Sequence, residues 1–158
     1  MEAKESLQGR LTIFTTPKPF SGHTAIIQRN AIQSWCQLIP ADQVLIFGDG
    51  EGVAEESLGL GVHHIPQVQS NEFGTPLISG MFAEAERISQ AKIMCYVNAD
   101  IILMNDILEA VKRIQASTDW FLMTGQRTDL DLTQLLPFQK GWEDQLLRKV
   151  SLDGRLHH

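Results

Sequence analysis

Five short apolar runs along the chain predict β-strands. The second run is almost entirely apolar, which is typical of a strand covered on both faces. The third run has the weakest pattern. Pro17 and Pro19 follow the first run and end it, because proline cannot occupy the interior of a hydrogen-bonded ladder. The runs cover residues 11–15, 43–47, 62–68, 93–97 and 120–124.

Segments with the spacing of amphipathic helices lie between these runs. Ile27, Ala31 and Trp35 recur every four residues and predict a helix over 23–38. Thr75 followed by Pro76 predicts the start of a helix that runs to about residue 90, because a hydroxyl caps the first turn and proline suits the first helical position. A short helix is predicted over 53–58. Another is predicted to begin with Asn105 or Asp106 as its N-cap, and Asp106 with Glu109 has the spacing of a capping box. A last helix is predicted in the tail, which carries Trp142, Leu146, Leu147 and Val150.

The alternation of predicted strands and helices, with short connections, indicates one α/β domain over residues 1–158. We expect a three-layer sandwich with a largely parallel, Rossmann-like central sheet. Ligands of such sheets bind outside the carboxyl ends of the strands. Residues that bind a ligand or take part in a reaction are therefore expected in the segments that follow the strands. These segments are 15–18, 48–52, 69–75, 98–100 and 125–131.

Composition narrows the class of protein without naming a function. With 13 Lys+Arg and 19 Asp+Glu, the formal net charge is −6, which disfavours non-specific nucleic-acid binding. An apolar fraction of 43% argues against disorder. No apolar run approaches the ~20 residues of a spanning helix, and no secretion signal precedes the first strand, so a cytoplasmic location is expected. Cys36 and Cys95 lie in apolar segments and are interpreted as buried free thiols.

Asn98 and Asp100 are the strongest candidates for chemistry. Asp100 stands between two apolar runs, where a poorly solvated carboxylate needs a partner or a metal. If the strand continues, Asn98 and Asp100 point to the same face and offer oxygen donors to one divalent cation. Mg²⁺ and Mn²⁺ commonly use one or two carboxylates and complete their shell with water and phosphates. The alternative is that Asp100 caps the turn before Asn105 or accepts backbone hydrogen bonds.

Four other segments carry weaker candidates, and each has a purely structural alternative. Asp49, in a glycine-rich turn, suits a ribose hydroxyl or a base N–H, or is simply a solvated acid. Thr15 and Thr16 suit the edge of a nucleobase, or belong to a proline-stiffened turn. Asn71 and Thr75 precede a predicted helix N-terminus, which favours an anion. Asp129 and Asp131 follow the fifth run and face an acceptor, act as a base, or lie in a solvated loop.

The order of these motifs resembles that of the nucleotide-diphospho-sugar transferases, glycosyltransferases of the GT-A fold. The resemblance rests on residues 11–18 and 44–49, and most of all on residues 95–102, which occupy the place of the family's D-x-D motif. It looks particularly like a bacterial and plant branch that carries the segment Asn-Ala-Asp-Ile. Residues 31–35 and 74–77 are also similar to sequence segments of that branch, and the resemblance covers residues 10–157.

The resemblance implies binding of a nucleoside diphosphate sugar and transfer of the sugar to a hydroxyl acceptor. Asp100 would hold Mn²⁺ or Mg²⁺ with help from Asn98, and the metal would neutralise the leaving diphosphate. Thr15, Thr16 and Asp49 would hold the nucleoside, and Asp129 or Asp131 would be the general base. Two features depart from the family. Asn98 replaces the leading acid of D-x-D, and the chain ends where similar proteins continue into an acceptor-binding half.

Two alternatives stand beside the transferase. A sugar-phosphate nucleotidylyltransferase shares the architecture but usually has a glycine-rich, basic first loop, whereas residues 15–19 contain one lysine and no glycine. A non-catalytic nucleotide-sugar-binding or interaction domain is the second alternative, since the chain is short. A missing C-terminal half would expose an apolar surface and favour a homo-oligomer.

Overall fold

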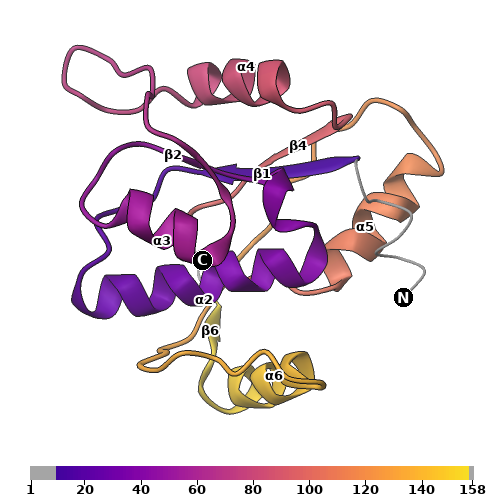
Figure 1. Ribbon diagram of the computed structural model, residues 1–158. Helices are drawn as coiled ribbons and strands as arrows, with labels where there is room; N and C mark the ends of the chain where they lie inside the picture. Colours follow the sequence, from indigo (N-terminus) through magenta and orange to yellow (C-terminus); the bar gives the residue numbers. More distant parts are fainter. Residues whose placement is uncertain (1–9, 157–158) are drawn as a thin grey trace.

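A computed structural model describes residues 10–156 of the chain. Within these residues a parallel four-stranded sheet has the order β3-β2-β1-β4 (Figure 1). The register pairs Ile13 with both Val44 and Cys95, so β1 lies between β2 and β4. The strands are β1 (Leu11–Thr15), β2 (Val44–Phe47), β3 (His63–Ile65) and β4 (Ile93–Tyr96). Four of the five predicted strands are therefore present, with β3 shorter than the sequence predicts.

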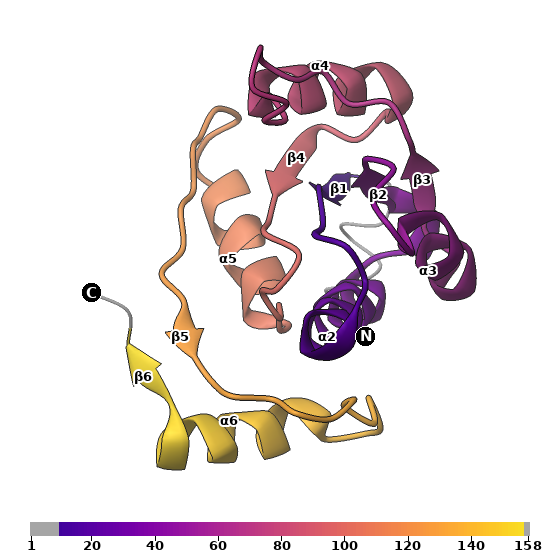
Figure 2. The same ribbon diagram turned by 90° about the vertical axis from the view of Figure 1, so that its left-hand side faces the viewer.

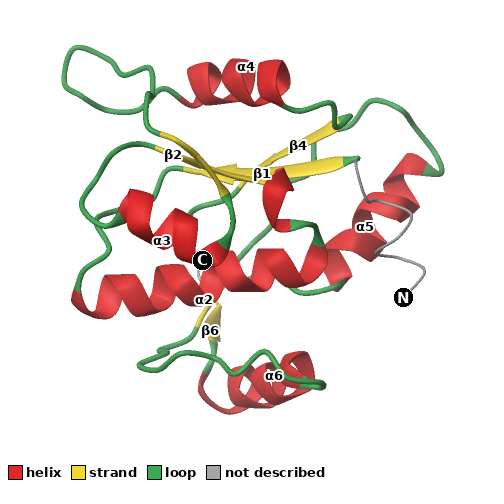
Figure 3. Ribbon diagram, viewed as in Figure 1, coloured by secondary structure: helices red, strands yellow, loops and turns green. Residues whose placement is uncertain are grey.

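Helices cover both faces of this sheet and complete the expected three layers (Figures 1 and 3). One helix, α4, covers one face, and α2, α3 and α5 cover the other. A short 3₁₀ turn, η1 (Ala41–Gln43), leads from α2 into β2. The helices are α2 (Gly22–Leu38), α3 (Val53–Leu60), α4 (Ile78–Ile88), α5 (Asp106–Gln115) and α6 (Trp142–Asp153).

The core is divided between the two faces because alternate residues of each strand point to opposite sides. The α2-side core includes Ile13 and Ile46 from the sheet, Trp35 from α2 and Leu108 from α5, all at most 1% exposed. The α4-side core comprises Phe14, Leu45, Phe47, Ile65, Met81 and Ala85. β1 and β2 are buried along their whole length, as the apolar second run predicts.

The prediction of a fifth strand over residues 120–124 is wrong. This run has no regular secondary structure, and only Phe121 packs against the α2-side core. Trp120 and Leu122 are each 91% exposed, so an apolar pattern is present without the second layer that would cover it. A separate antiparallel pair forms instead from β5 (Thr128–Asp129) and β6 (Arg155–Leu156). α6 lies beneath α2 in Figures 1 and 2.

The predicted start of α4 is wrong. For α5 the predicted N-cap position at Asn105 is confirmed, but the predicted capping box is not. α4 begins at Ile78, two residues after Pro76, and its N-cap Leu77 has no side-chain hydrogen bond. α5 has Asn105 at its N-cap and Asp106 inside the helix, so Asp106 and Glu109 form no capping box. The chain already has helical dihedral angles at Asn105, and its carbonyl accepts the N–H of Leu108 at 3.1 Å. A backbone carbonyl therefore accepts a hydrogen bond from the first turn of α5, where the sequence predicts a side chain as the acceptor.

Cys36 and Cys95 form no disulfide, in agreement with the expected thiols, and both are half-buried, which is less burial than expected. Burial in the sheet raises the pKa of Cys95 to about 11, which keeps this thiol protonated at neutral pH. No helix within residues 10–156 is both long enough and apolar enough to cross a membrane.

An ion pair between Arg29 of α2 and Glu56 of α3 joins two helices of the same layer. The Arg29 Nε–H donates to Glu56 Oε2 at 2.7 Å, and a second N–H donates to Oε1. The hydrogen bond from Arg29 is the largest cause that holds the pKa of Glu56 below its ordinary value; burial opposes it. A lowered pKa adds stability above the ordinary glutamate pKa of about 4.3, and this stability is lost as the pH falls below it.

We therefore expect Arg29→Met to lower the free energy of unfolding at pH 7 by about 0.5–1 kcal/mol, because both side chains are partly exposed. The difference from the wild-type protein should shrink as the pH falls from 7 to 3, because protonation of Glu56 weakens the ion pair. Urea unfolding at the two pH values measures it. Arg87→Met, which removes the exposed pair with Glu84 on α4, is the control and should show little pH-dependent loss. An Arg29→Met deficit of the same size at both pH values would contradict the assignment.

Candidate functional site

The strand order reverses between β1 and β4, which makes their carboxyl ends the topological switch point of the sheet. Pairing continues one residue past β4, because the Val97 N–H donates to the Phe14 carbonyl at 3.1 Å. Thr15 and Thr16 therefore lie next to the start of the loop that contains Asn98 and Asp100. The prediction that these two segments share one edge of the sheet is confirmed.

At this edge of the sheet, Thr15 carries a buried hydroxyl without a hydrogen-bond partner within residues 10–156. Its side chain is completely buried, and its hydroxyl has no hydrogen-bond partner among the described residues. A buried hydroxyl without a partner costs about 1–3 kcal/mol, so such groups are rare outside sites where a ligand or water satisfies them. Thr15 was predicted as a binding residue, and its unpartnered hydroxyl is consistent with that prediction.

The second strand ends beside Thr16. A Cβ atom on Gly48 would lie 3.6 Å from the Thr16 hydroxyl oxygen, and Gly48 has a φ of +105°, which favours glycine. Asp49 follows directly and is exposed. The ends of β1, β2 and β4 thus carry Thr15, Thr16, Asp49, Asn98 and Asp100 along one edge.

Asp100 is exposed, so the expectation of a poorly solvated carboxylate is wrong. The strand ends at Tyr96, and the Ile101 N–H donates to the Asn98 carbonyl at 3.1 Å, which turns residues 98–101 away from the sheet. The argument that strand geometry places Asn98 and Asp100 on one face therefore does not hold. Asp100 is still close enough to Tyr96 to help raise the pKa of its phenol, although burial is the larger cause.

The donor set at this edge does not form a complete metal site by itself. Within residues 10–156 no three His, Cys, Asp or Glu side chains gather where they could hold a metal ion. Asp100 and Asn98 offer one carboxylate and one amide oxygen. That fits a Mg²⁺ or Mn²⁺ ion that takes its other ligands from water and a diphosphate, and does not fit a cation enclosed by protein ligands.

Helix α2 holds the loops on both sides of the switch point with buried polar side chains. Gln28, only 2% exposed, accepts the Lys18 N–H at 2.8 Å and donates to the Lys18 carbonyl at 2.9 Å. The Trp35 indole N–H donates to the Ile101 carbonyl at 2.9 Å, and Ser34 Oγ accepts the Leu103 N–H at 3.0 Å. These bonds fix the loop after β1 and the loop after β4 to one rigid element.

The sequence prediction missed these buried polar residues. Ala25, Gln28, Ile32 and Trp35 follow one another at spacings of three or four residues, and all are buried. Gln28 therefore lies on the apolar stripe of α2, where a polar side chain needs a hydrogen-bond partner. A polar residue on the apolar stripe was the signal that could have identified it.

Asn71 and Thr75 form a self-contained turn. The Asn71 carboxamide oxygen accepts the N–H groups of Phe73 at 3.0 Å and Thr75 at 2.9 Å, and all three residues are exposed. The expectation that this loop ends at a helix N-terminus is wrong, because α4 begins only at Ile78. A ligand-binding role for Asn71 and Thr75 stays a prediction, and their observed hydrogen bonds are structural.

Asp129 and Asp131, the predicted bases, lie in residues 128–156, which run from β5 to β6 and are called the C-terminal ribbon below, and not beside Asp100. Asp129 in β5 accepts a hydrogen bond from Arg127 at 2.9 Å. Asp131 is 4.0 Å from the His23 ring at the start of α2, and both carboxylates are exposed. In Figure 2 the strand β5 lies below α5, apart from the end of β4. A catalytic role for either residue stays a prediction.

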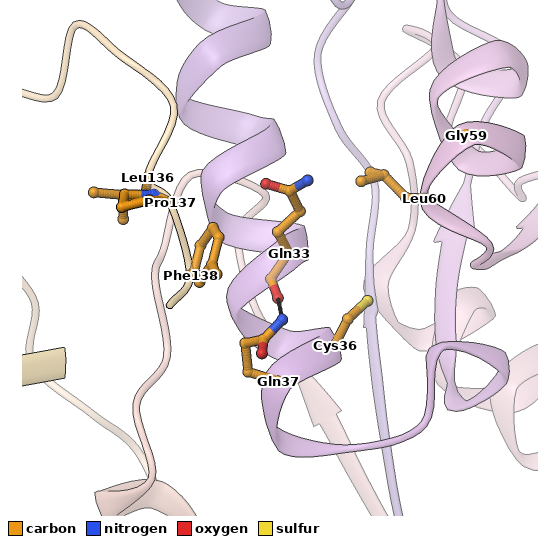
Figure 4. Close-up of a pocket in the computed structure, with 8 residues that line it drawn as sticks. All are labelled: Gln33, Cys36, Gln37, Gly59, Leu60, Leu136, Pro137 and Phe138. Atoms are coloured by element: carbon orange, nitrogen blue, oxygen red, sulfur yellow. Dashed lines mark hydrogen bonds between the residues drawn. The ribbon is translucent and has the colours of Figure 1, made fainter. Parts of the chain in front are cut away.

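A pocket of about 290 Å³ lies elsewhere, between α2, the end of α3 and residues 136–138. Figure 4 shows Gln33, Cys36 and Gln37 of α2 along it, with Leu60 on one side and Phe138 on the other. None of its lining residues belongs to the candidate site at the sheet edge.

Comparisons of the chain with protein-family models, with curated proteins and with solved structures find no match. The class that fold and site define is therefore an α/β domain with a Rossmann-like parallel sheet and a polar switch point.

Proposed function

We propose that the chain binds a nucleoside diphosphate sugar at the β1/β4 switch point, as a GT-A-type donor-binding domain, and transfers the sugar to a hydroxyl acceptor. The observation that carries the proposal is the position of the unpartnered Thr15 hydroxyl. It lies on the same sheet edge as Asp100, between the ends of the strands where α/β folds bind nucleotides.

Each residue of the edge has a role that suits its surroundings. Thr15 and Thr16, between the ends of β2 and β4, bind the nucleoside, and Asp49 accepts a hydrogen bond from its ribose or base. Asp100 is solvent-exposed and has no ion pair among the described residues, so its carboxylate is free to take a cation. Asn98 contributes an amide oxygen. A bound Mn²⁺ or Mg²⁺ ion supplies neutralisation of the departing diphosphate.

One observation favours a second candidate, a nucleotide-sugar-binding domain without transferase activity. Asp129 and Asp131 are the acids predicted to deprotonate the acceptor, and both lie on the C-terminal ribbon, bound to or near other residues. A general base must reach within hydrogen-bond distance of the acceptor hydroxyl. Binding of the diphosphate without sugar transfer is the result that this second candidate predicts.

Isothermal titration calorimetry with uridine, guanosine and adenosine diphosphates, with and without Mn²⁺, tests the proposal. We expect one diphosphate to bind only with the metal, and Asp100→Ala to weaken that binding at least about tenfold, or about 1.4 kcal/mol. The loss follows because the metal keeps only an amide oxygen from the protein.

The matched control is Asp42→Ala, which removes an exposed acid before β2, at the opposite end of the sheet. It should leave diphosphate affinity unchanged. Equal effects of the two substitutions, or diphosphate binding that does not depend on metal, would reject the metal-dependent donor site. A strong preference for a triphosphate would favour the nucleotidylyltransferase instead.

A further inference from the structure

The outer edge of β4 has unused backbone groups. The Ile93 N–H donates to the Arg10 carbonyl at 2.9 Å and the Val97 N–H to the Phe14 carbonyl at 3.1 Å, so the odd-numbered residues face β1. Backbone groups alternate in direction along a strand, and those of Met94 and Tyr96 therefore face away from β1. No backbone hydrogen bond between residues 10 and 156 pairs this outer edge.

The side chains of β4 are also incompletely covered. All four residues of the strand are only half-buried, whereas every residue of β1 and β2 is buried. Ile93 and Cys95 contact the α2-side core, and Met94 and Tyr96 contact the α4-side core. Both faces of the sheet thus end at β4 with apolar surface still in contact with water.

Residues 120–124 belong to the chain between α5 and β5. In Figure 2 this part of the chain lies on the side of β4 away from β1, separated from β4 and along the outer side of α5. Phe121 and Cys95 both pack against the α2-side core. Trp120 and Leu122, which flank Phe121, are 91% exposed. In a strand they would point to the opposite face from Phe121, which is the face of Met94 and Tyr96.

We propose that residues 120–124 close onto β4 as a fifth parallel strand, with Trp120 beside Met94 and Leu122 beside Tyr96. In this register the N–H groups of Met94 and Tyr96 donate to the carbonyls of Asp119 and Phe121. Trp120 and Leu122 cover the half-exposed side chains of Met94 and Tyr96 on the α4 side. Phe121 keeps its present core.

An existing turn is compatible with this closure. The Thr118 hydroxyl accepts the Trp120 N–H at 3.2 Å and donates to the Trp120 carbonyl at 3.0 Å. In the proposed register, the backbone groups of Phe121 and Met123 face β4, and those of Trp120 face outward. Thr118 therefore satisfies groups on the new outer edge without competing with the new pairing, and shields that edge from another chain.

Closure would also regulate the candidate site, and this part rests on the proposed function. A parallel strand at 120–124 has its carboxyl end on the same side of the sheet as the carboxyl end of β4. The chain that follows it therefore reaches the loop of Asn98 and Asp100. Arg127, now paired with Asp129, would be brought toward that loop with its guanidinium available to a phosphate. A diphosphate that contacts Asp100 through a metal and also Arg127 would favour the closed state.

Disulfide trapping tests the closure itself without any ligand. We make Met94→Cys with Trp120→Cys in a chain that also carries Cys36→Ser and Cys95→Ala, and oxidise it at low protein concentration. Paired neighbours on adjacent strands are close enough for a disulfide. We expect an intramolecular cross-link at least about tenfold faster than in a control chain that combines Trp120→Cys with Leu58→Cys on α3, because only the first pair meets on closure.

The possible results of the cross-linking experiment distinguish the closure from its regulatory role and from the proposed function. Equal rates in the two chains would overturn the closure, and a cross-link between two chains would assign the β4 edge to a second copy instead. Acceleration of the intramolecular cross-link by a diphosphate with Mn²⁺ would support the regulatory part, and its absence would overturn that part alone. Failure of the calorimetric experiment with an intact cross-link would reject the proposed function and leave the closure standing.

Hydrogen exchange provides a second measurement in a chain with its native β4. In the double variant Trp120→Ser and Leu122→Ser, which alters only exposed side chains, we expect the Met94 and Tyr96 amides to exchange at least about threefold faster than in the wild-type protein. The Ile93 and Val97 amides, which bond to β1, serve as internal controls and should not change. Unchanged exchange at Met94 and Tyr96 would overturn the closure.

Discussion

Trp35→Ala is expected to lower the free energy of unfolding by about 3–5 kcal/mol, a large share of the stability of a domain of this size. Trp35 is completely buried at the centre of the α2-side core. Its removal leaves a cavity and also removes the indole N–H that binds the Ile101 carbonyl at 2.9 Å. Urea unfolding, followed by circular dichroism, measures the loss.

Two variants divide this loss into packing and hydrogen bonding. Trp35→Phe retains most of the apolar ring but leaves the Ile101 carbonyl without its donor, which should cost about 1–3 kcal/mol. Leu58→Ala, at a side chain that is 84% exposed, should change stability by less than about 0.5 kcal/mol. If Trp35→Ala were no more damaging than Leu58→Ala, the packing of α2 against the sheet would be wrong.

Periodicity was enough to predict the helices and strands that bury a continuous apolar face. α2 follows the prediction within one residue at its start, and β1 and β2 agree within one residue at each end. The reason is that these elements lie at the centre of the sheet, where both faces are covered and pattern and burial coincide. β3 keeps only three of the seven residues predicted, since His63 is exposed and Pro66 follows the strand at once.

Local pattern failed where neighbouring structure decided the outcome. Residues 120–124 have the composition of a strand, but a strand also needs a hydrogen-bonded neighbour and cover on both faces. Thr75 and Pro76 have the chemistry of a helix start, but the Asn71 side chain captures the Thr75 N–H in a turn before the helix begins. Neither the missing neighbour of residues 120–124 nor the competing hydrogen bond of Asn71 is visible in the spacing of apolar residues.

The same distinction applies to the candidate site. The order of strands and the residues at their ends were sufficient to place Thr15 and Asp100 on one edge of the sheet, since parallel strands end together. The exposure of Asp100 was not predictable, because it depends on a turn closed by a single hydrogen bond between Ile101 and Asn98. Apolar neighbours in sequence do not guarantee apolar surroundings in space.

Asn30 fastens the C-terminal ribbon to α2, and its removal should have the second-largest effect on stability. Its side chain is completely buried, donates to the Gln134 carbonyl at 2.9 Å and accepts the Leu136 N–H at 2.8 Å. Asn30→Ala leaves both backbone groups without their partner, which should cost about 2–3 kcal/mol. Thermal unfolding measures that cost for the whole domain.

Limited proteolysis distinguishes a local from a global effect of Asn30→Ala. Because the lost bonds hold only residues 134–136, trypsin should cut after Lys140 faster in the variant than in the wild-type protein, before the sheet unfolds. Gln33→Ala is the matched control on the same helix, since the Gln33 side chain is half-buried and lines the pocket beside Leu136 but does not make the two hydrogen bonds that Asn30 makes to Gln134 and Leu136. If Asn30→Ala and Gln33→Ala were cut at the same rate, the two bonds of Asn30 would not be what fastens the ribbon, and the α6 segment would have to be retained by other contacts such as that between Glu143 and the Asn105 N–H at 3.0 Å.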